Sequence, residues 1–307
     1  MENTTSPLDV HILPFFMKTE NSLFIIFSSV YFFFNYLFGV LVNIVIIAVI
    51  CLDFHLHTPM YLFLFNLSVV DMCYTTVTIP KLLYILLSGN NTMLITQCFI
   101  QMYFMCLADS AEDIILFIMA YDRYVAICHP LHYHHILNKK VCILLIIVVW
   151  IGGSLNSTFI TSSILKIIFC FSVTIHQFFC DAKALINISC GGTKVFYIVL
   201  YAECLSFGLC PVICNLMSYV KIIRVIQHIK SKDGRSKAFS TCSSHLIVMA
   251  IFYGSALSVY MTPPLDRYDL LEQILTMFYT TVVPILNPLI YSLRNNEVKS
   301  SLRKFLF

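Results

Sequence analysis

The sequence predicts an all-α fold, a bundle of seven transmembrane helices followed by a short amphipathic helix on the membrane surface. Composition, the number of long apolar stretches and the distribution of basic residues predict it. Of 307 residues, 59% are hydrophobic and only 11% are charged, and the mean hydropathy is +0.85. Soluble domains carry roughly 25% charged residues, so this composition indicates a membrane protein. The net charge of +3 is too small to indicate a nucleic-acid partner.

Seven stretches are apolar over the roughly 20 residues that a helix needs to cross the hydrocarbon core. Four of these stretches contain no Asp, Glu, Lys or Arg: residues 21–52, 141–165, 238–265 and 274–293. The other three carry acids but no Lys or Arg: residues 57–80, 98–121 and 195–220. The chain is expected to form one domain, residues 1–307, whose predicted spans are 23–51, 58–86, 98–128, 140–161, 195–228, 238–261 and 270–293. Residues 296–306 are predicted to form the membrane-surface helix.

The basic residues predict the orientation of the bundle. With the N-terminus outside, 13 of the 19 Lys and Arg residues fall on the inner loops and the C-terminal tail, and the remaining 6 fall outside. Basic residues are enriched in cytoplasmic loops, so we expect an extracellular N-terminus. The first inner loop has no Lys or Arg, so the prediction depends on the other loops.

Five acids lie within the apolar stretches: Asp71, Asp109, Glu112, Asp113 and Glu203. The apolar stretches that contain them have no Lys or Arg to pair with these acids. Carboxylates are costly in hydrocarbon and usually mark a function, so they are protonated, hold a cation, or face a wet cavity that admits a cationic ligand. The three acids of the third span are spaced i, i+3 and i+4, which places them on one helix face toward the bundle interior.

Four cysteines, at 98, 170, 180 and 190, lie on the predicted outer side, where the environment is oxidising and disulfides form. Four cysteines allow three pairings, and the residues alone do not choose among them. The predicted outer tail carries a glycosylation sequon, Asn3-Thr4-Thr5, and we expect Asn3 to be modified.

Four motifs follow one another along the chain. Met119 to Leu131 reads MAYDRYVAICHPL, Leu56 to Tyr61 reads LHTPMY, Lys237 to His245 reads KAFSTCSSH, and Pro284 to Asn295 reads PILNPLIYSLRN. In sequence and order, these motifs closely resemble the signatures of vertebrate olfactory receptors, members of the rhodopsin-like (class A) G-protein-coupled receptors. The resemblance covers nearly the whole chain.

The resemblance implies roles for individual residues. It implies two disulfides, Cys98–Cys180 and Cys170–Cys190, and a sodium or water site at Asp71 and Glu112. The residues that it assigns to activation and G-protein coupling are Asp122, Arg123, Tyr124, Tyr219, His245, Asn287, Pro288 and Tyr291.

Helix depth places the expected odorant pocket in the outer half of the bundle. Its expected residues are Met105, Cys106, Asp109, Ser110, Asp113, Asn156, Glu203, Phe207, Tyr253, Ala256, Tyr260, Met277 and Thr280. Apolar walls with a few polar groups suit a small organic molecule. Because Asp109 and Glu203 lie near one depth without a basic partner, our hypothesis is that the odorant is a cationic amine. The alternative is a neutral odorant beside protonated or structural acids.

The resemblance implies a receptor rather than an enzyme, located in the plasma membrane of olfactory neuron cilia. Such a receptor needs no cofactor beyond the sodium ion. It would activate a stimulatory olfactory-type G protein and raise cyclic AMP, with an odorant, that G protein and lipids as partners. The alternatives are a non-olfactory class A receptor for a small amine and, with less support, a transporter or channel. An iron enzyme of the membrane desaturase type is not expected. Its iron site needs several separate clusters of histidines, whereas this chain has one such cluster, at residues 129, 132, 134 and 135.

Overall fold

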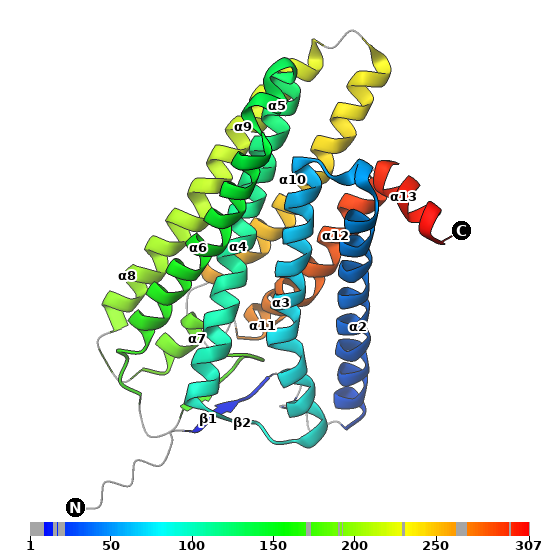
Figure 1. The fold of residues 1–307 in the computed structure, drawn as a ribbon. Helices are drawn as coiled ribbons and strands as arrows, with labels where there is room; N and C mark the ends of the chain where they lie inside the picture. The colour runs from blue at the N-terminus through cyan, green and yellow to red at the C-terminus, as the bar shows by residue number, and fades with distance from the viewer. Residues whose placement is uncertain are drawn as a thin grey trace, which may run out of the picture.

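The computed structural model describes residues 9–14, 17, 22–169, 173–189, 191, 193–228, 231–261, 269–294 and 296–306. Long helices packed side by side form a bundle, with a small sheet at one end (Figure 1). We call the end that carries the sheet and the Cys98–Cys180 bond the disulfide end. The opposite end, at the top of Figure 1, is called the Arg123 end.

Helices occupy all seven predicted spans. The first four spans correspond to α2 (Ser22–Leu52), α3 (Pro59–Ser88), α4 (Ile95–Cys128) and α6 (Lys139–Ile164). The fifth is continuous through α8 (Thr193–Glu203), the π-helical turn η3 (Cys204–Leu209) and α9 (Cys210–Gln227). The sixth is α10 (Lys232–Met261), and the seventh runs through α11 (Asp269–Met277), the π-helical turn η5 (Phe278–Val282) and α12 (Val283–Arg294). The observed ends differ most from the predicted ones at α10, which begins at Lys232 rather than at residue 238.

Five helical segments are long and apolar enough to cross a membrane by length and composition: Ser22–Leu52, Pro59–Ser88, Lys139–Ile164, Lys194–Gln227 and Leu270–Ile290. The helix α4 carries buried acids, and α10 begins with charged turns before its apolar part, His245–Tyr260. Outward-facing side chains such as Phe27 and Phe34 are exposed apolar groups, which suits contact with lipid rather than with water. The predicted all-α, seven-helix fold class is confirmed.

Local sequence explains where several helices begin and end. Pro59 occupies the first turn of α3, where its missing N–H costs nothing. The same helix ends at Gly89, whose φ of 68° is a left-handed conformation that favours glycine. The N-cap of α6 is Asn138, whose side chain accepts a hydrogen bond from the backbone N–H of Val141 at 3.1 Å.

The helix α4 lies at the centre of the bundle and packs against α3, α6 and α9. A Cβ atom added at Gly153 of α6 would lie 3.3 Å from the carbonyl oxygen of Leu107 in α4. The backbones of α4 and α6 therefore approach closely there, as small residues allow in membrane helix pairs. This close approach fixes the wall from which the acids of α4 project.

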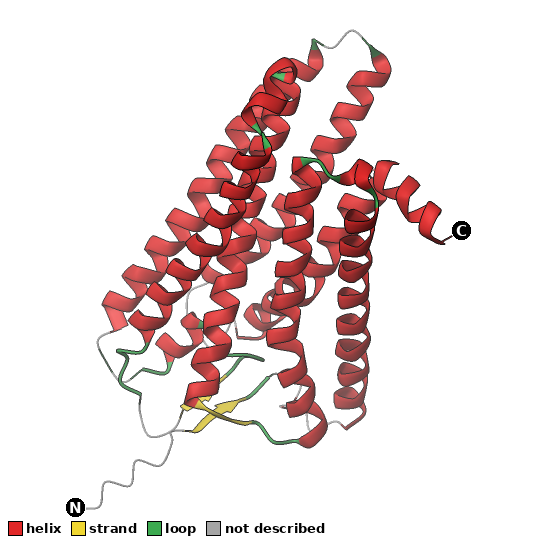
Figure 2. Cartoon of the chain, viewed as in Figure 1, coloured by secondary structure: helices red, strands yellow, loops and turns green. Residues whose placement is uncertain are grey.

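The small sheet was not predicted from the sequence. Strand β1 (Asp9–Ile12) pairs antiparallel with β2 (Thr92–Leu94) and parallel with β3 (Val173–Ile175), as the yellow strands in Figure 2 show. Strands of three or four residues are too short to give a clear alternation of polar and apolar positions. The sheet ties the N-terminal segment to two loops at the disulfide end.

At the Arg123 end, the connections between helices include the short helical turns η1 (Phe54–Leu56), η2 (Pro130–His132) and α5 (Tyr133–Ile136). The helix α13 (Asn296–Leu306) occupies the range predicted for the surface helix. The hydroxyl of Ser301 donates to Asp53 Oδ2 at 2.5 Å, and Tyr61 donates to Glu297 at 2.7 Å. Hydrogen bonds from Ser301 and His55 hold the pKa of Asp53 well below its usual range. These contacts dock α13 against the turn that follows α2.

Candidate functional site

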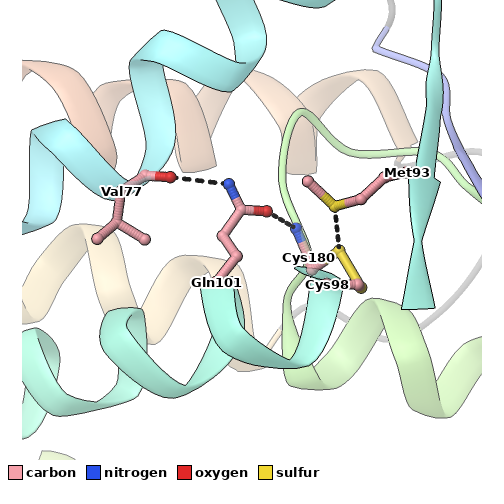
Figure 3. Close-up of a disulfide and its surroundings, with 5 residues drawn as sticks. All are labelled: Val77, Met93, Cys98, Gln101 and Cys180. Atoms are coloured by element: carbon pink, nitrogen blue, oxygen red, sulfur yellow. Dashed lines mark hydrogen bonds between the residues drawn. A yellow bond between two sulfur atoms is a disulfide. The ribbon is translucent and has the colours of Figure 1, made fainter. Parts of the chain in front are cut away.

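A disulfide joins Cys98 at the start of α4 to Cys180 in the loop before α7 (Ala182–Asn187). Next to it, Gln101 donates to the carbonyl oxygen of Val77 at 2.9 Å and accepts from the Cys180 N–H at 3.0 Å, as Figure 3 shows. Met93 Sδ lies 3.6 Å from Cys180 Sγ. The loop is therefore attached to α4 both covalently and through Gln101. The expected Cys170–Cys190 bond and the sequon at Asn3 lie outside the described residues.

The loop segment after Cys180 is also anchored to α10 and α11. Lys183 is only 1% exposed, and its Nζ donates to the carbonyl oxygen of Val259 and to Glu272 Oε2, both at 2.8 Å. Asp181 caps α7 and accepts a hydrogen bond from Tyr260 at 3.1 Å. Burial raises the pKa of Asp181 above its usual value, against the opposing effects of Tyr260 and Lys183. We call residues 181–187 the lid.

Beneath the lid lies a cavity of about 140 Å³. An engineered apolar cavity of about 150 Å³ is large enough to bind benzene, so this cavity suits a small organic molecule. Ten of the thirteen expected pocket residues line it: Cys106, Asp109, Ser110, Asp113, Asn156, Glu203, Phe207, Tyr253, Ala256 and Tyr260. The wall also includes residues that sequence reasoning missed, namely Ile160, Ser163, Ile164, Ala182, Ile186, Phe196, Val199, Leu200, Cys204, Gly208, Phe252, Leu257 and Tyr279.

Three expected pocket residues do not line the cavity. Met105 is buried in the helix-packing core, and Met277 packs against the same core. Thr280 is buried and donates to the carbonyl oxygen of Thr276 at 2.9 Å, while its neighbour Tyr279 faces the cavity instead. These residues were placed by their depth in the bundle, which does not determine the helix face on which a residue lies. At Thr280, the π-helical turn η5 also inserts an extra residue and rotates that face.

Each acid of the cavity wall accepts a hydrogen bond from a neighbouring side chain. Tyr279 donates to Asp109, and Tyr253 donates to Asp113 at 2.5 Å. Across the cavity, Asn156 Nδ2 donates both to Glu203 Oε2 at 3.2 Å and to Ser110 Oγ at 3.0 Å. The lining residues that the structure describes include no Lys, Arg or His. The cavity therefore brings together three carboxyl groups with hydrogen-bond donors but without a cationic partner.

Deeper in the bundle, Asn287 connects the remaining two acids. Its Nδ2 donates to Asp71 Oδ1 at 3.0 Å and to Glu112 Oε1 at 2.7 Å. The second oxygen of Asp71 is buried and has no hydrogen-bond partner among the described residues. Within the described part of the chain, no group of three or more His, Cys, Asp or Glu side chains is arranged to hold a metal ion. Nearby, Asn43 donates to the carbonyl oxygen of Pro284 at 3.2 Å, which ties α2 to α12.

The expected activation residues gather at the Arg123 end and in α12. Arg123 Nε lies 3.7 Å from Asp122 Oδ2, and Tyr133 donates to the other oxygen of Asp122 at 2.8 Å. The Tyr219 hydroxyl and His245 Nδ1 share a buried hydrogen bond of 2.5 Å. Among the other expected residues, the ring of Tyr124 lies beneath the Lys221 ammonium, Pro288 lies inside α12, and the side chain of Tyr291 is outside the described residues.

Comparison with known proteins places this geometry in a family. A family model described as olfactory receptor matches residues 32–307. The human olfactory receptor 8D1 is 43% identical over 284 residues, 92% of this chain and 91% of that protein. The gorilla olfactory receptor 1G1 is 41% identical over 306 residues, 100% of this chain and 97% of that protein. The canine olfactory receptor-like protein OLF4 is 41% identical over 288 residues, 94% of this chain and 92% of that protein.

These matches extend over nearly the full length of the chain and confirm the resemblance seen in the four motifs. The family consists of multi-pass membrane receptors that respond to odorants, generally through G proteins and cyclic AMP. The chain belongs to the olfactory receptor family.

Proposed function

We propose that the cavity beneath the lid is the odorant-binding site of this receptor and that the odorant is a cationic amine. The observation that carries the proposal is the set of three carboxyl groups, on Asp109, Asp113 and Glu203, around one cavity whose described lining residues include no cation. An ammonium group entering the cavity supplies the charge that these acids lack.

The hydrogen bonds of the acids suit the charged state that a bound cation would induce. Donors from Tyr279, Tyr253 and Asn156 point at the carboxyl oxygens, and donation of this kind stabilises an ionised carboxylate. An ionised carboxylate without a counter-ion is costly in an apolar environment. A bound ammonium offsets that cost, whereas a neutral odorant does not.

A cyclic AMP assay tests this proposal. In cells that express the receptor with a stimulatory olfactory-type G protein, we expect amines to be active and the alcohols and ketones of equal chain length to be inactive. The triple variant Asp109→Asn/Asp113→Asn/Glu203→Gln is expected to raise the half-maximal amine concentration by at least about tenfold, because it removes all three carboxyl groups of the cavity wall. Asp9→Asn, an exposed acid at the same end of the bundle, is the matched control.

A response limited to neutral odorants, retained by the triple variant at normal surface expression, would contradict the amine proposal and leave the family assignment intact.

For signalling, we place the N-terminus and the lid outside the cell and the Arg123 end inside, in the plasma membrane of olfactory cilia. Ligand binding then favours a packing of the helices that opens a cleft for the G protein near Arg123, Tyr219 and His245. The basic residues of α9 and α10 and those of α13 suit contact with anionic lipids at the inner surface.

We also propose that Asp71 and Glu112 hold a sodium ion. The unpartnered oxygen of Asp71 beside Glu112 supports this, since oxygen ligands suit hard cations. Replacing external sodium by a large organic cation is expected to change the agonist concentration for half-maximal response by about fivefold or more, the range typical of allosteric coupling. Asp71→Asn is expected to abolish that sodium dependence. An equal dependence in the wild type and the variant would contradict the site.

A further inference from the structure

The acids of the cavity lie on two different walls. Asp109 and Asp113 project from α4, one helical turn apart, and their hydrogen-bond donors come from η5 and α10. Glu203, the last residue of α8, is bound by Asn156 of α6. We call the first pair the α4 pole and Glu203 the α8 pole.

Each pole offers at least one carboxyl group to a bound ammonium group. Like charges one helical turn apart repel each other, and in a low-dielectric site two neighbouring carboxyl groups resist double ionisation. An ammonium group at the α4 pole therefore needs only one of Asp109 and Asp113 to be ionised. Glu203, on another helix and with its own donor, is available to a second ammonium group. A ligand with a single ammonium group engages only one pole.

The distance between the poles is short. Asn156 Nδ2 is bonded at 3.0 Å to Ser110 Oγ and at 3.2 Å to Glu203 Oε2, so these two oxygens are at most 6.2 Å apart. Asp113 lies three residues after Ser110 on α4, a spacing at which Cβ atoms are about 5–6 Å apart, and Asp109 directly precedes Ser110. A short alkyl chain can span such a separation.

Most of the remaining cavity wall is apolar. Phe207, Val199, Leu257 and Ile186 line the cavity, and the last of these belongs to the lid. A hydrocarbon segment buried against these side chains gains hydrophobic stabilisation. The chemistry of the site is therefore acidic at two places and apolar over most of the remaining wall.

We propose that the cavity recognises an alkyl diamine, with one ammonium group at the α4 pole and the other at the α8 pole. This inference rests on the proposed function, namely that the odorant is an amine bound in this cavity. It assigns a specificity to the two poles: the diamine engages both, whereas a monoamine engages one at a time.

Ligands of equal chain length test the inference on the unchanged receptor. Cadaverine, pentylamine, N-acetylcadaverine and pentanol share a five-carbon chain but carry two, one, one and no positive charges. We expect cadaverine to reach half-maximal cyclic AMP response at a concentration at least about tenfold below that of pentylamine, because it gains a second buried charge contact. N-acetylcadaverine is expected to behave like pentylamine, which separates the effect of charge from that of length.

Single substitutions then test the poles separately. Glu203→Gln is expected to bring the sensitivity to cadaverine down to that of pentylamine while leaving the sensitivity to pentylamine nearly unchanged, since the monoamine still uses the α4 pole. Asp109→Asn/Asp113→Asn is expected to do the same from the other side. Asp9→Asn is again the control, and surface expression is measured for each variant.

The outcomes separate this inference from the proposed function. Equal potency of cadaverine and pentylamine on the unchanged receptor would overturn the diamine inference and leave the amine receptor standing. Responses to pentanol alone, or to none of the four ligands at normal surface expression, would overturn both.

Discussion

The variant Glu272→Ala is expected to lose about 3–5 kcal/mol of folding stability, because it leaves the Lys183 ammonium buried without its carboxylate. Lys183 is 1% exposed, and its Nζ lies 2.8 Å from Glu272 Oε2. The carbonyl oxygen of Val259, which also accepts a hydrogen bond from this Nζ, does not neutralise the charge. Thermal unfolding of the purified receptor in detergent, without ligand, measures the loss.

A second variant separates the charge effect from loss of packing. Lys183→Met/Glu272→Leu replaces both charges by apolar groups of similar size, and such replacements of buried ion pairs are often neutral or stabilising. We therefore expect the double variant to unfold near the wild-type temperature and Glu272→Ala to unfold well below it. If both variants unfolded at the same reduced temperature, side-chain volume rather than charge would hold the lid.

Loss of this ion pair also has a consequence for ligand binding. Ala182 and Ile186 of the lid line the cavity, and Lys183 lies between them in the chain. A lid released from α10 and α11 opens more often, and dissociation rates respond to such changes more than association rates do. Ligand dissociation is therefore expected to be faster in Glu272→Ala than in the double variant.

Much of the fold could be predicted from the sequence because the bilayer imposes a simple rule. A helix that crosses hydrocarbon must be long, apolar and internally hydrogen-bonded, so hydropathy located the helices with ends near the observed ones. The short strands at the disulfide end obey no such rule. Their pairing depends on segments far apart in the sequence, such as Asp9–Ile12 and Val173–Ile175.

The cavity was predictable only in part, for a reason visible in η5. Depth along the helix placed Thr280 at the cavity, whereas the π-helical turn presents Tyr279. Lys183 illustrates a second limit. The sequence places it in an outer loop, where solvent exposure is the ordinary expectation for lysine. Only the fold of the lid buries it against Glu272.

The variant Asn287→Asp is expected to lose about 3 kcal/mol or more of folding stability, together with most of the odorant response. Asn287 is the donor for both Asp71 Oδ1 and Glu112 Oε1. A carboxylate in its place removes two hydrogen bonds and puts three acids within contact distance in a buried site, where unpaired charge is most costly. Thermal unfolding and the cyclic AMP response measure the two effects.

The second-site change Asp71→Asn is expected to restore part of the stability lost in Asn287→Asp, because the amide then donates to the new carboxylate from the opposite helix. Glu112 still lacks its donor, so the restoration is incomplete. The control is Asn215→Asp, which buries a carboxylate in α9 at another fully buried asparagine. If the hydrogen bond between residues 71 and 287 is what stabilises the bundle, Asp71→Asn rescues Asn287→Asp but not Asn215→Asp. Equal rescue of the two variants, or rescue of neither, would mean that Asp71, Glu112 and Asn287 do not act as one hydrogen-bonded unit.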